Sequence, residues 1–190
     1  HLFCLIHDDL IDRGLSRYGL STIDQFIEQY FAQHPQLIEI DHSNFDSNHF
    51  SQAIALLIGD LTLSWSTQAI IQNPGFEESH WLSALKERNQ LLQDVIFGQI
   101  FDVELTLKQS VNVTKLEQVH NLKTASYTFV RPMLIAASLA GQLQFSSLFQ
   151  NVGTLLGQVF QLQDDYFDIV GQSNEVESRR FTDLTAGQPT

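Results

Sequence analysis

Cysteine and basic residues are scarce in this sequence of 190 residues. The single cysteine, Cys4, excludes a disulfide within the chain, and such disulfides are typical of oxidising compartments. Lys and Arg number 10 against 22 Asp and Glu, which gives a formal net charge of −12. Because nucleic-acid binding depends on clustered Lys and Arg, this balance argues against a nucleic-acid surface. We therefore expect a reducing, cytoplasmic location and no nucleic-acid partner.

Long uncharged apolar runs are also missing. No stretch of 18 apolar residues without a charge occurs, whereas a helix needs about 20 to span a bilayer. We therefore expect that the protein is not integral to a membrane. With 43% hydrophobic and 17% charged residues, the chain can bury a core, most simply as one domain over residues 1–190. The chain begins at His1, inside an expected helix, and we expect it to be a fragment that lacks both ends of a longer protein.

The persistent apolar spacing is that of helices, and no Asn-Gly or Asp-Gly hairpin signal occurs. This pattern predicts an all-α fold. Capping residues are expected at Ser21 and at Thr114, the latter paired with Glu117. Pro132 is expected to kink or interrupt a helix near residue 130 or 131. The remaining helices are predicted over residues 1–12, 50–72, 77–108 and 146–170.

Two clusters of aspartates stand at the ends of apolar, helix-like runs. The first is Asp8-Asp9-Leu10-Ile11-Asp12, and the second is Asp164-Asp165-Tyr166-Phe167-Asp168. In a helix, the first and last aspartates of each cluster lie one turn apart on the same face. Carboxylates this close repel one another and rarely stay charged in apolar surroundings without a cation. We interpret the two clusters as two walls of one cation site.

The ligand type narrows the choice of cation. Carboxylates without nearby Cys or a His-x-x-x-His pair favour Mg²⁺, Mn²⁺ or Ca²⁺. Mg²⁺ commonly completes its shell with water and phosphate oxygens, so two aspartate walls can clamp a diphosphate. Either cluster alone is equally explained as a solvated helix end, because Asp is frequent at helix boundaries. A structural Ca²⁺ protein is disfavoured, because neither cluster lies in a glycine-centred loop of twelve residues.

Six motifs follow one another along the chain. They are Leu5 to Asp12 with Arg17-x-Gly19, Gly59-Asp60, Gly98-Gln99-x-x-Asp102, Lys123-Thr124, Gly157-x-x-Phe160-Gln161, and Asp164-Asp165-x-x-Asp168. In this order they resemble the motif series of the trans-isoprenyl diphosphate synthases. The resemblance implies long, mostly antiparallel helices around a deep cavity, usually in a homodimer. It also implies a prenyltransferase that adds isopentenyl diphosphate to an allylic diphosphate, giving a short- or medium-chain all-trans product.

The resemblance further implies roles for individual residues. Arg17 and Lys123 would hold the allylic diphosphate, and Thr124 and Gln161 would lie beside the developing carbocation. Gln161 would also contact the substrate. Mg²⁺ is the implied metal, with Mn²⁺ as an alternative. The implied metal ligands are Asp8, Asp12 and Asp164, assisted by Asp9, Asp165 and Asp168.

Phe3 and Cys4 precede Asp8 by just over one helical turn, so they are expected to project toward the floor of the cavity. In the family, bulk at these positions limits product length, and Phe3 therefore favours a short or medium product. A carbocation survives only where water is excluded. The 14 phenylalanines suit an apolar tunnel, although most are expected to be ordinary core.

The sequence departs from the family pattern at several places, including Leu20-Ser21, where a Lys-Pro pair is usual. Tyr18 stands where a second arginine is usual, Gln188 stands where a lysine is usual, and an upstream Gly-Lys-x-x-Arg-type segment is absent. We therefore expect the isolated chain to be inactive. A non-catalytic partner subunit remains an alternative, favoured by Tyr18 and Gln188 and opposed by the six retained aspartates. A class I terpene cyclase is a further alternative, opposed by the second aspartate cluster.

Overall fold

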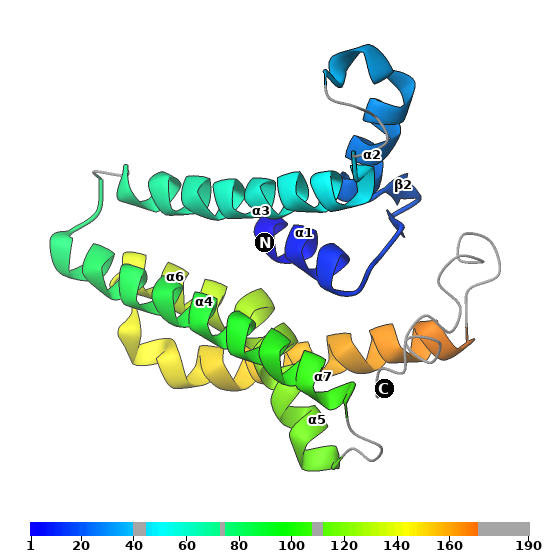
Figure 1. The fold of residues 1–190 in the computed structure, drawn as a ribbon. Coiled ribbons are helices and arrows are strands. Elements are labelled where there is room, and N and C mark those ends of the chain that lie inside the picture. Colours follow the sequence, from blue (N-terminus) through cyan, green and yellow to red (C-terminus); the bar gives the residue numbers. More distant parts are fainter. Residues whose placement is uncertain (40–44, 73–74, 108–111, 171–190) are drawn as a thin grey trace. The chain divides into compact units, whose positions relative to one another are not determined.

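The computed structural model describes residues 1–39, 45–72, 75–107 and 112–170, without the side chains of 165 and 168–170 (Figure 1). Its contacts form two compact units, His1–Pro74 and Gly75–Thr190, which are considered separately below. Within the described residues, one short hairpin is the sole departure from helices and their connections. The all-α prediction is therefore confirmed, and the prediction of a single domain stays a prediction.

The first unit is built on the long helix α3 (Ser47–Ile71). Helices α1 (Leu2–Ile11) and α2 (Ile23–Gln33) both pack against it. Asp46 caps the N-terminus of α3, because its carboxylate accepts a hydrogen bond from the backbone N–H of His49. This cap lets the helix begin a few residues earlier than the sequence pattern indicated.

A two-stranded hairpin, β1 (Ser16–Arg17) and β2 (Leu20–Ser21), lies between α1 and α2. Its turn consists of Tyr18 and Gly19, which both have positive φ, 54° and 76°. Positive φ at both turn residues is the geometry that matches the twist of paired strands. The sequence analysis missed this hairpin because a tyrosine rarely adopts positive φ.

Two predicted helix caps are wrong. Thr22, not Ser21, is the residue that directly precedes α2. At the other end of α2, a short 3₁₀ turn, η1 (Pro35–Leu37), follows the helix. Helix α5 (Val113–Val119) is capped by Asn112, whose side chain accepts a hydrogen bond from the backbone N–H of Thr114. The capping box expected between Thr114 and Glu117 therefore does not form, because the helix starts two residues earlier.

The second unit is centred on η3 (His120–Val130), an 11-residue π-helix. Helices α4 (Glu78–Leu105) and α7 (Ser146–Val170) both pack against it (Figure 1). Helix α6 (Arg131–Leu139) continues directly from η3, with Pro132 in its first turn. Proline has no backbone N–H, so it can donate no hydrogen bond to the preceding helix at this position. The chain stays helical through Val130 and Arg131, where the helix type changes from π to α, and the predicted kink or interruption stays a prediction.

Glycines let η3 approach its neighbours closely. A Cβ built at Gly98 of α4 would lie 2.5 Å from the backbone nitrogen of Lys123. On α7, a Cβ at Gly157 would overlap Ala125, and one at Gly153 would lie 2.9 Å from the η3 backbone. The backbones of these helices are therefore nearer than larger residues would allow. Any side chain at these positions must displace η3.

Helix α3 is long and apolar enough, by length and composition alone, to be a candidate membrane span. The sequence alone indicated no membrane-spanning helix, because the criterion was an apolar run without a charged residue and α3 contains Asp60. A core helix of a soluble protein passes the same test. The finding therefore carries little weight by itself.

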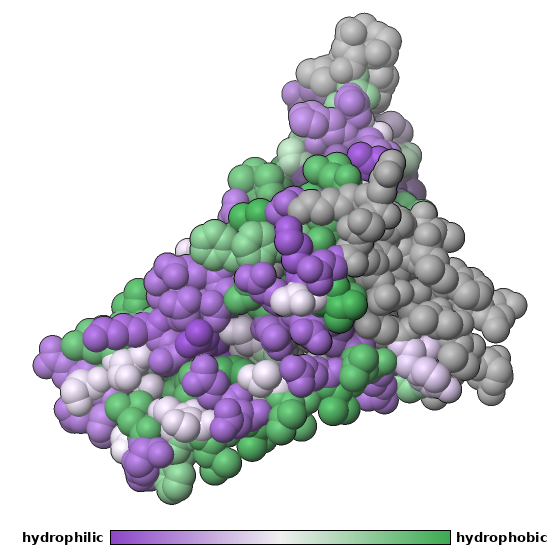
Figure 2. Space-filling view, turned by 90° about the horizontal axis from the view of Figure 1, so that it is seen from below, coloured by the Kyte–Doolittle hydropathy of each residue, from purple (hydrophilic) through white to green (hydrophobic). Residues whose placement is uncertain are grey.

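Apolar side chains are also exposed outside α3. Figure 2 shows them as green areas among purple polar residues on the face presented. On α7 they recur at alternating steps of four and three residues, the spacing of a helix face that packs against another helix. A 3₁₀ turn, η4 (Leu143–Phe145), precedes this helix. The exposed residues of α7 with this spacing are Leu148, Val152, Leu155, Val159, Leu162 and Tyr166, and Leu156 and Phe160 are exposed beside them.

Candidate functional site

Asp8 and Asp9, in the last turn of α1, both bind Arg17 of the hairpin. The Nε atom of Arg17 donates to Oδ1 of Asp9 at 2.8 Å, and its Nη2 atom donates to Oδ2 of Asp8 at 3.0 Å. The same Nη2 atom lies 2.7 Å from Oδ1 of Asp9. The structure thus brings together two predicted metal ligands and a predicted diphosphate-binding cation. Such two-pronged contacts fix both the position and the orientation of a guanidinium.

The chain reversal after α1 positions Arg17. The backbone N–H of Asp12 donates to the carbonyl of Asp8 at 2.8 Å, which confirms that these residues lie one helical turn apart. The N–H of Gly14 donates to the carbonyl of Asp9 at 2.8 Å, and the Thr22 hydroxyl donates to the carbonyl of Gly14 at 2.9 Å. These bonds fix the path of the loop. The hairpin can therefore return Arg17 to the carboxylates that precede it.

The electrostatics of this cluster favour the charged form of Arg17. Burial alone would lower the pKa of Arg17, but hydrogen bonds and charges from Asp9 and Asp8 raise that pKa above its ordinary value. One guanidinium beside two carboxylates leaves an excess of negative charge. The donors are carboxylate oxygens, which suit Mg²⁺ chemically. Among the described side chains no group of three or more His, Cys, Asp or Glu gathers, so the metal ligand set stays a prediction.

The Gly59-Asp60 motif of α3 receives His7 of α1. The imidazole Nε2 lies 3.2 Å from the carbonyl oxygen of Leu56 and 3.6 Å from Oδ1 of Asp60. A Cβ at Gly59 would overlap the ring, so this glycine gives the His7 side chain the room it occupies. Because His7 directly precedes Asp8, this contact sets the rotation of α1 that presents the aspartates. The sequence analysis did not single out His7.

Phe3 and Cys4 lie on α1 one turn before the aspartates. Phe3 is buried at 6% exposure, and its ring meets the His7 ring edge-on at 6.3 Å. Burial raises the pKa of the Cys4 thiol to about 11, so the thiol is neutral at physiological pH. Phe3 is thus shielded from water, and Cys4 is partly shielded. Their product-length function stays a prediction.

The second unit brings together three of the predicted motifs. Lys123 Nζ lies 2.6 Å from Oδ2 of Asp102 on α4. The adjacent Thr124 donates its hydroxyl proton to Oε1 of Gln161 on α7 at 2.7 Å. Gly98, one turn before Asp102, admits the backbone of Lys123. Neighbouring residues of η3 therefore face helices on opposite sides, with Lys123 held at α4 and Thr124 held at α7.

The second aspartate cluster lies at the end of α7. Asp164 is exposed, three residues beyond Gln161 on the same helix. The side chains of Asp165 and Asp168, and the departure at Gln188, lie outside the described residues. The two clusters belong to different compact units. A clamp formed between them therefore stays a prediction.

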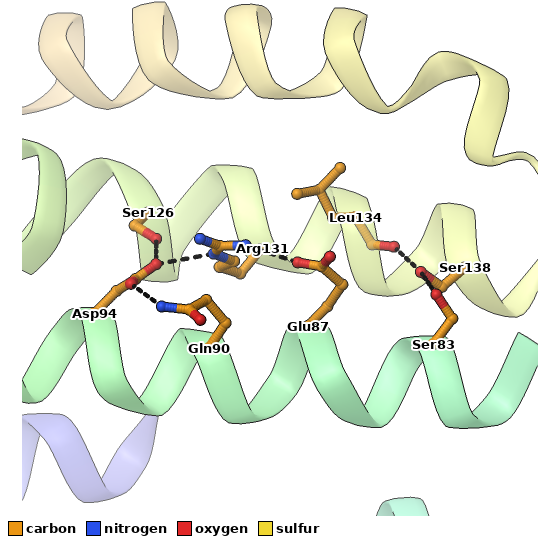
Figure 3. A network of polar contacts seen from close by, with 8 residues as sticks. All are labelled: Ser83, Glu87, Gln90, Asp94, Ser126, Arg131, Leu134 and Ser138. Carbon is orange, nitrogen blue, oxygen red and sulfur yellow. Dashed lines mark hydrogen bonds and ion pairs between the residues drawn. The ribbon is translucent and has the colours of Figure 1, made fainter.

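A polar network joins α4 to η3 and the first residue of α6 (Figure 3), and the sequence analysis missed it. Its members are Glu87, Gln90, Asp94, Ser126 and Arg131. Arg131 donates from Nε to Oδ2 of Asp94 at 2.8 Å and from Nη1 to Oε2 of Glu87 at 2.7 Å. Ser126 donates to the same Asp94 oxygen at 2.5 Å, and Gln90 donates to Oδ1 at 2.8 Å. Asp94 thus receives three donors.

The network keeps a buried carboxylate charged. Burial alone would raise the pKa of Asp94, yet hydrogen bonds from Ser126, Gln90 and Arg131 hold that pKa below its ordinary value. One signal in the sequence points to this residue, because Asp94 lies one helical turn before Gly98 and two before Asp102. These three positions share one face of α4.

Comparison with known proteins places this geometry among relatives. The family model described as polyprenyl synthetase matches residues 1–190. The chain is 26% identical to farnesyl diphosphate synthase of Haemophilus influenzae over 91% of its length, covering 61% of that protein. It is 23% identical to geranylfarnesyl diphosphate synthase of Natronomonas pharaonis over 99% of its length, covering 48% of that protein. The chain therefore spans about half to three fifths of these two curated relatives.

Solved structures of prenyl diphosphate synthases also resemble this chain. A geranylgeranyl pyrophosphate synthase from Corynebacterium glutamicum, complexed with isoprenyl diphosphate and magnesium, matches with a TM-score of 0.80 and 27% identity. The match covers 99% of this chain and 48% of that one. A T. brucei farnesyl diphosphate synthase matches with a TM-score of 0.61 at 18% identity, over 90% of this chain and 57% of that one. The second likeness concerns the fold alone.

Proposed function

Because the chain belongs to the polyprenyl synthetase family, we propose that it carries the allylic-diphosphate side of a Mg²⁺-dependent prenyltransferase site. The proposed reaction condenses isopentenyl diphosphate with an allylic diphosphate and yields a short- or medium-chain all-trans prenyl diphosphate. Since the chain covers only part of its relatives, the activity is proposed for the complete protein. The 190-residue chain alone is expected to be inactive.

The contact between Thr124 and Gln161 carries this proposal. The two residues come from η3 and α7, and their side chains meet at 2.7 Å. Lys123, directly before Thr124, has its ammonium group 2.6 Å from Asp102. Lys123, the proposed cation for the diphosphate, therefore directly precedes Thr124, which together with Gln161 supplies uncharged dipoles for a carbocation. This is the combination that ionisation of an allylic diphosphate needs.

In the proposed mechanism, the allylic C–O bond breaks and its electron pair leaves with the diphosphate. Arg17 and Lys123 donate charge-assisted hydrogen bonds to the departing group, which stabilises the charge that develops on it. Each bond of this kind contributes about 1.5–3 kcal/mol. Asp102 orients Lys123, and the pair of Asp8 and Asp9 orients Arg17. These carboxylates act as positioning groups for the two cations.

The allylic cation that remains needs dipoles rather than a nucleophile nearby. The oxygens of Thr124 and Gln161 supply partial negative charge, and their mutual hydrogen bond fixes their orientation. The double bond of isopentenyl diphosphate attacks the cation to form the new C–C bond, and the departed diphosphate can accept the proton that is then lost. Apolar surroundings exclude water that would otherwise trap the cation.

The aspartates are the proposed holders of Mg²⁺. Asp8, Asp9 and Asp12 supply oxygen donors on α1, and Asp164, Asp165 and Asp168 supply the second set. When bound, the metal would neutralise charge on the diphosphate. The similar structure that holds isoprenyl diphosphate and magnesium supports this choice of cation.

Product length is proposed to depend on Phe3 and Cys4. Phe3 is the bulkier of the two and is buried one turn below the aspartates. Replacing it by alanine should lengthen the product, because the growing chain would gain room. Chromatography of products from Phe3→Ala and wild type measures this effect. An unchanged product length contradicts the proposal.

A homodimer in the cytoplasm is the proposed state. Its support is the exposed apolar surface, because large apolar patches usually mark an interface. Light scattering after size-exclusion chromatography gives the mass directly. A monomeric mass for the complete protein, across micromolar concentrations, would count against the dimer.

Incubation of the complete protein with labelled isopentenyl diphosphate and three allylic starters, with and without Mg²⁺, tests the function. We expect a prenyl product only with metal. Thr124→Val should lower kcat, because it keeps the shape but removes the hydroxyl. Thr154→Val is the matched control, since its hydroxyl bonds only to the α7 carbonyl of Gln150. Product formed without metal would overturn the mechanism.

A non-catalytic partner subunit is the second candidate function. Tyr18 favours it, because this residue occupies the hairpin turn where the family carries a second arginine, and its side chain is 76% exposed. The same incubation separates the two candidates. No incorporation with any starter, followed by activity when a second prenyl synthase subunit is added, would establish the subunit role.

A further inference from the structure

The π-helical winding of η3 requires an explanation. The π-helix is rare and usually short, because its hydrogen bonds join residues five apart instead of four. Here it extends over 11 residues, His120–Val130. At its end, the backbone N–H of Arg131 donates to the carbonyl of Ser126, which is a bond of this five-residue type. Ser126 and Arg131 therefore mark the last π turn.

The side chains of the same two residues meet at one atom. Ser126 and Arg131 both donate to Oδ2 of Asp94, at 2.5 and 2.8 Å (Figure 3). In an α-helix, residues five apart are rotated by about 140° around the axis, given about 100° per residue, so they lie on different faces. The π winding puts them on one face. Asp94 can accept from both only while this turn is π-helical.

The position of this turn matters for the chemistry upstream. Ser126 lies only two residues after Thr124 and three after Lys123. If the segment rewound as an α-helix, every preceding side chain would rotate about the axis. Lys123 would turn away from Asp102, and Thr124 would turn away from Gln161. Gly98 and Gly157 hold the η3 backbone close to both helices, but glycine contacts do not select a rotation.

We propose that Asp94 is a positioning residue that selects the π winding of η3 through Ser126 and Arg131, and so aims Lys123 and Thr124 at the substrate. Asp94 itself lies too far along α4 to share the contacts of Lys123, which are made two turns away at Asp102. Glu87 and Gln90 support the arrangement, because they bind Arg131 and Asp94 from the same helix. The catalytic part of this inference rests on the proposed function, whereas the winding does not.

Hydroxyl deletions in the complete protein test the inference. Ser126→Ala removes one of the two donors that define the last π turn. Ser83→Ala is the matched control, because its hydroxyl on α4 contacts Ser138 of α6 at 3.3 Å and is joined to neither Asp94 nor Arg131 in Figure 3. Asp94→Asn is a second variant with a larger expected effect, since the amide nitrogen that replaces one carboxylate oxygen is itself a donor and would face a donor. Hydrogen exchange over residues 120–131 and steady-state kinetics are measured on each.

We expect Ser126→Ala to speed amide exchange over residues 120–131 by about tenfold, because a hydrogen bond to a charged group is lost. Its kcat should fall about tenfold while KM for the allylic diphosphate changes less than about threefold, as expected when a contact acts mainly in the transition state. Ser83→Ala should resemble wild type in both measurements.

Two results would overturn the inference. One is unchanged exchange over residues 120–131 in Ser126→Ala, and the other is an increase of the same size throughout residues 75–170, which would indicate general loosening. If wild type forms no prenyl product, the proposed function fails. Exchange over residues 120–131 then still decides whether Asp94 selects the winding.

Discussion

A methyl group added at Gly98 would test the packing of η3 against α4. In Gly98→Ala, the new Cβ would lie 2.5 Å from the backbone nitrogen and 2.7 Å from the Cα of Lys123, and 2.9 Å from the carbonyl carbon of Leu122. All three atoms belong to the backbone. A backbone cannot rotate away as the end of a side chain can, so η3 must shift as a whole.

Two opposing effects set the size of the change. Alanine is better than glycine inside a helix by about 1 kcal/mol. Overpacking costs about 1–3 kcal/mol, and three backbone contacts this short indicate the upper end of that range. The net loss in the free energy of unfolding is therefore about 2 kcal/mol. For a chain of this size it corresponds to a fall in Tm of about 4–8 °C.

Gly59→Ala is the matched control on α3. Its Cβ would meet the imidazole ring of His7, which is the end of a side chain and can move. The gain in helix preference, about 1 kcal/mol, then opposes the loss of the hydrogen bond from His7, about 0.5–1.5 kcal/mol. We expect a Tm within about 2 °C of wild type.

Thermal unfolding followed by circular dichroism compares the three proteins. The reasoning predicts that Gly98→Ala is the least stable and that Gly59→Ala resembles wild type. A Tm for Gly98→Ala equal to or above that of wild type would refute it. Such a result would mean that α4 and η3 can separate without loss of other contacts.

Further predictions concern single groups. The folded-state pKa of Asp94 lies below 3.8, its unfolded value. Its contribution to stability is therefore complete above that pH and is lost as the pH falls through the folded value. Asp94→Asn should flatten the fall in unfolding free energy between about pH 5 and pH 2, measured by urea denaturation. Desolvation raises the pKa of Cys4 to about 11, so alkylation at neutral pH, followed by mass spectrometry, should be slower in the native protein than in urea. Tyr18→Gly should raise the Tm by about 2–4 °C, because relieving positive φ at a non-glycine residue gains about 1 kcal/mol; a lower Tm would contradict this account of the turn.

Much of the helical fold could be predicted because it depends on local patterns. The bounds of α7, Ser146–Val170, agree with the expected range, since an apolar face and a following glycine define them. The hairpin could not be predicted, because Tyr18 adopts a conformation that its residue type disfavours. Nor could the π-helix, because its winding depends on Asp94, which lies far away in the sequence.

The same distinction holds for the candidate site. The motifs around Lys123 and Gln161 could be recognised from residue order, and the structure adds contacts that residue order did not predict, Lys123 with Asp102 and Thr124 with Gln161. The network of Asp94 and Arg131 was missed, because its members are 37 residues apart and follow no helical spacing. Side chains that join distant segments become visible only once the helices are packed.

The glycine contacts of η3 also determine how its order responds to heat. At Gly153, Gly157 and Ala125 the helices meet through residues that have no rotamers to lose when they are buried. Interfaces made of long side chains must instead freeze those rotamers, and this entropic penalty grows with temperature. The part of the α7–η3 interface around Gly157 and Ala125 should therefore resist local melting better than the parts where Gln161 and Phe160 supply the contacts. The side chains of Lys123 and Thr124 would then keep their orientation while the exposed ends of the helices fray.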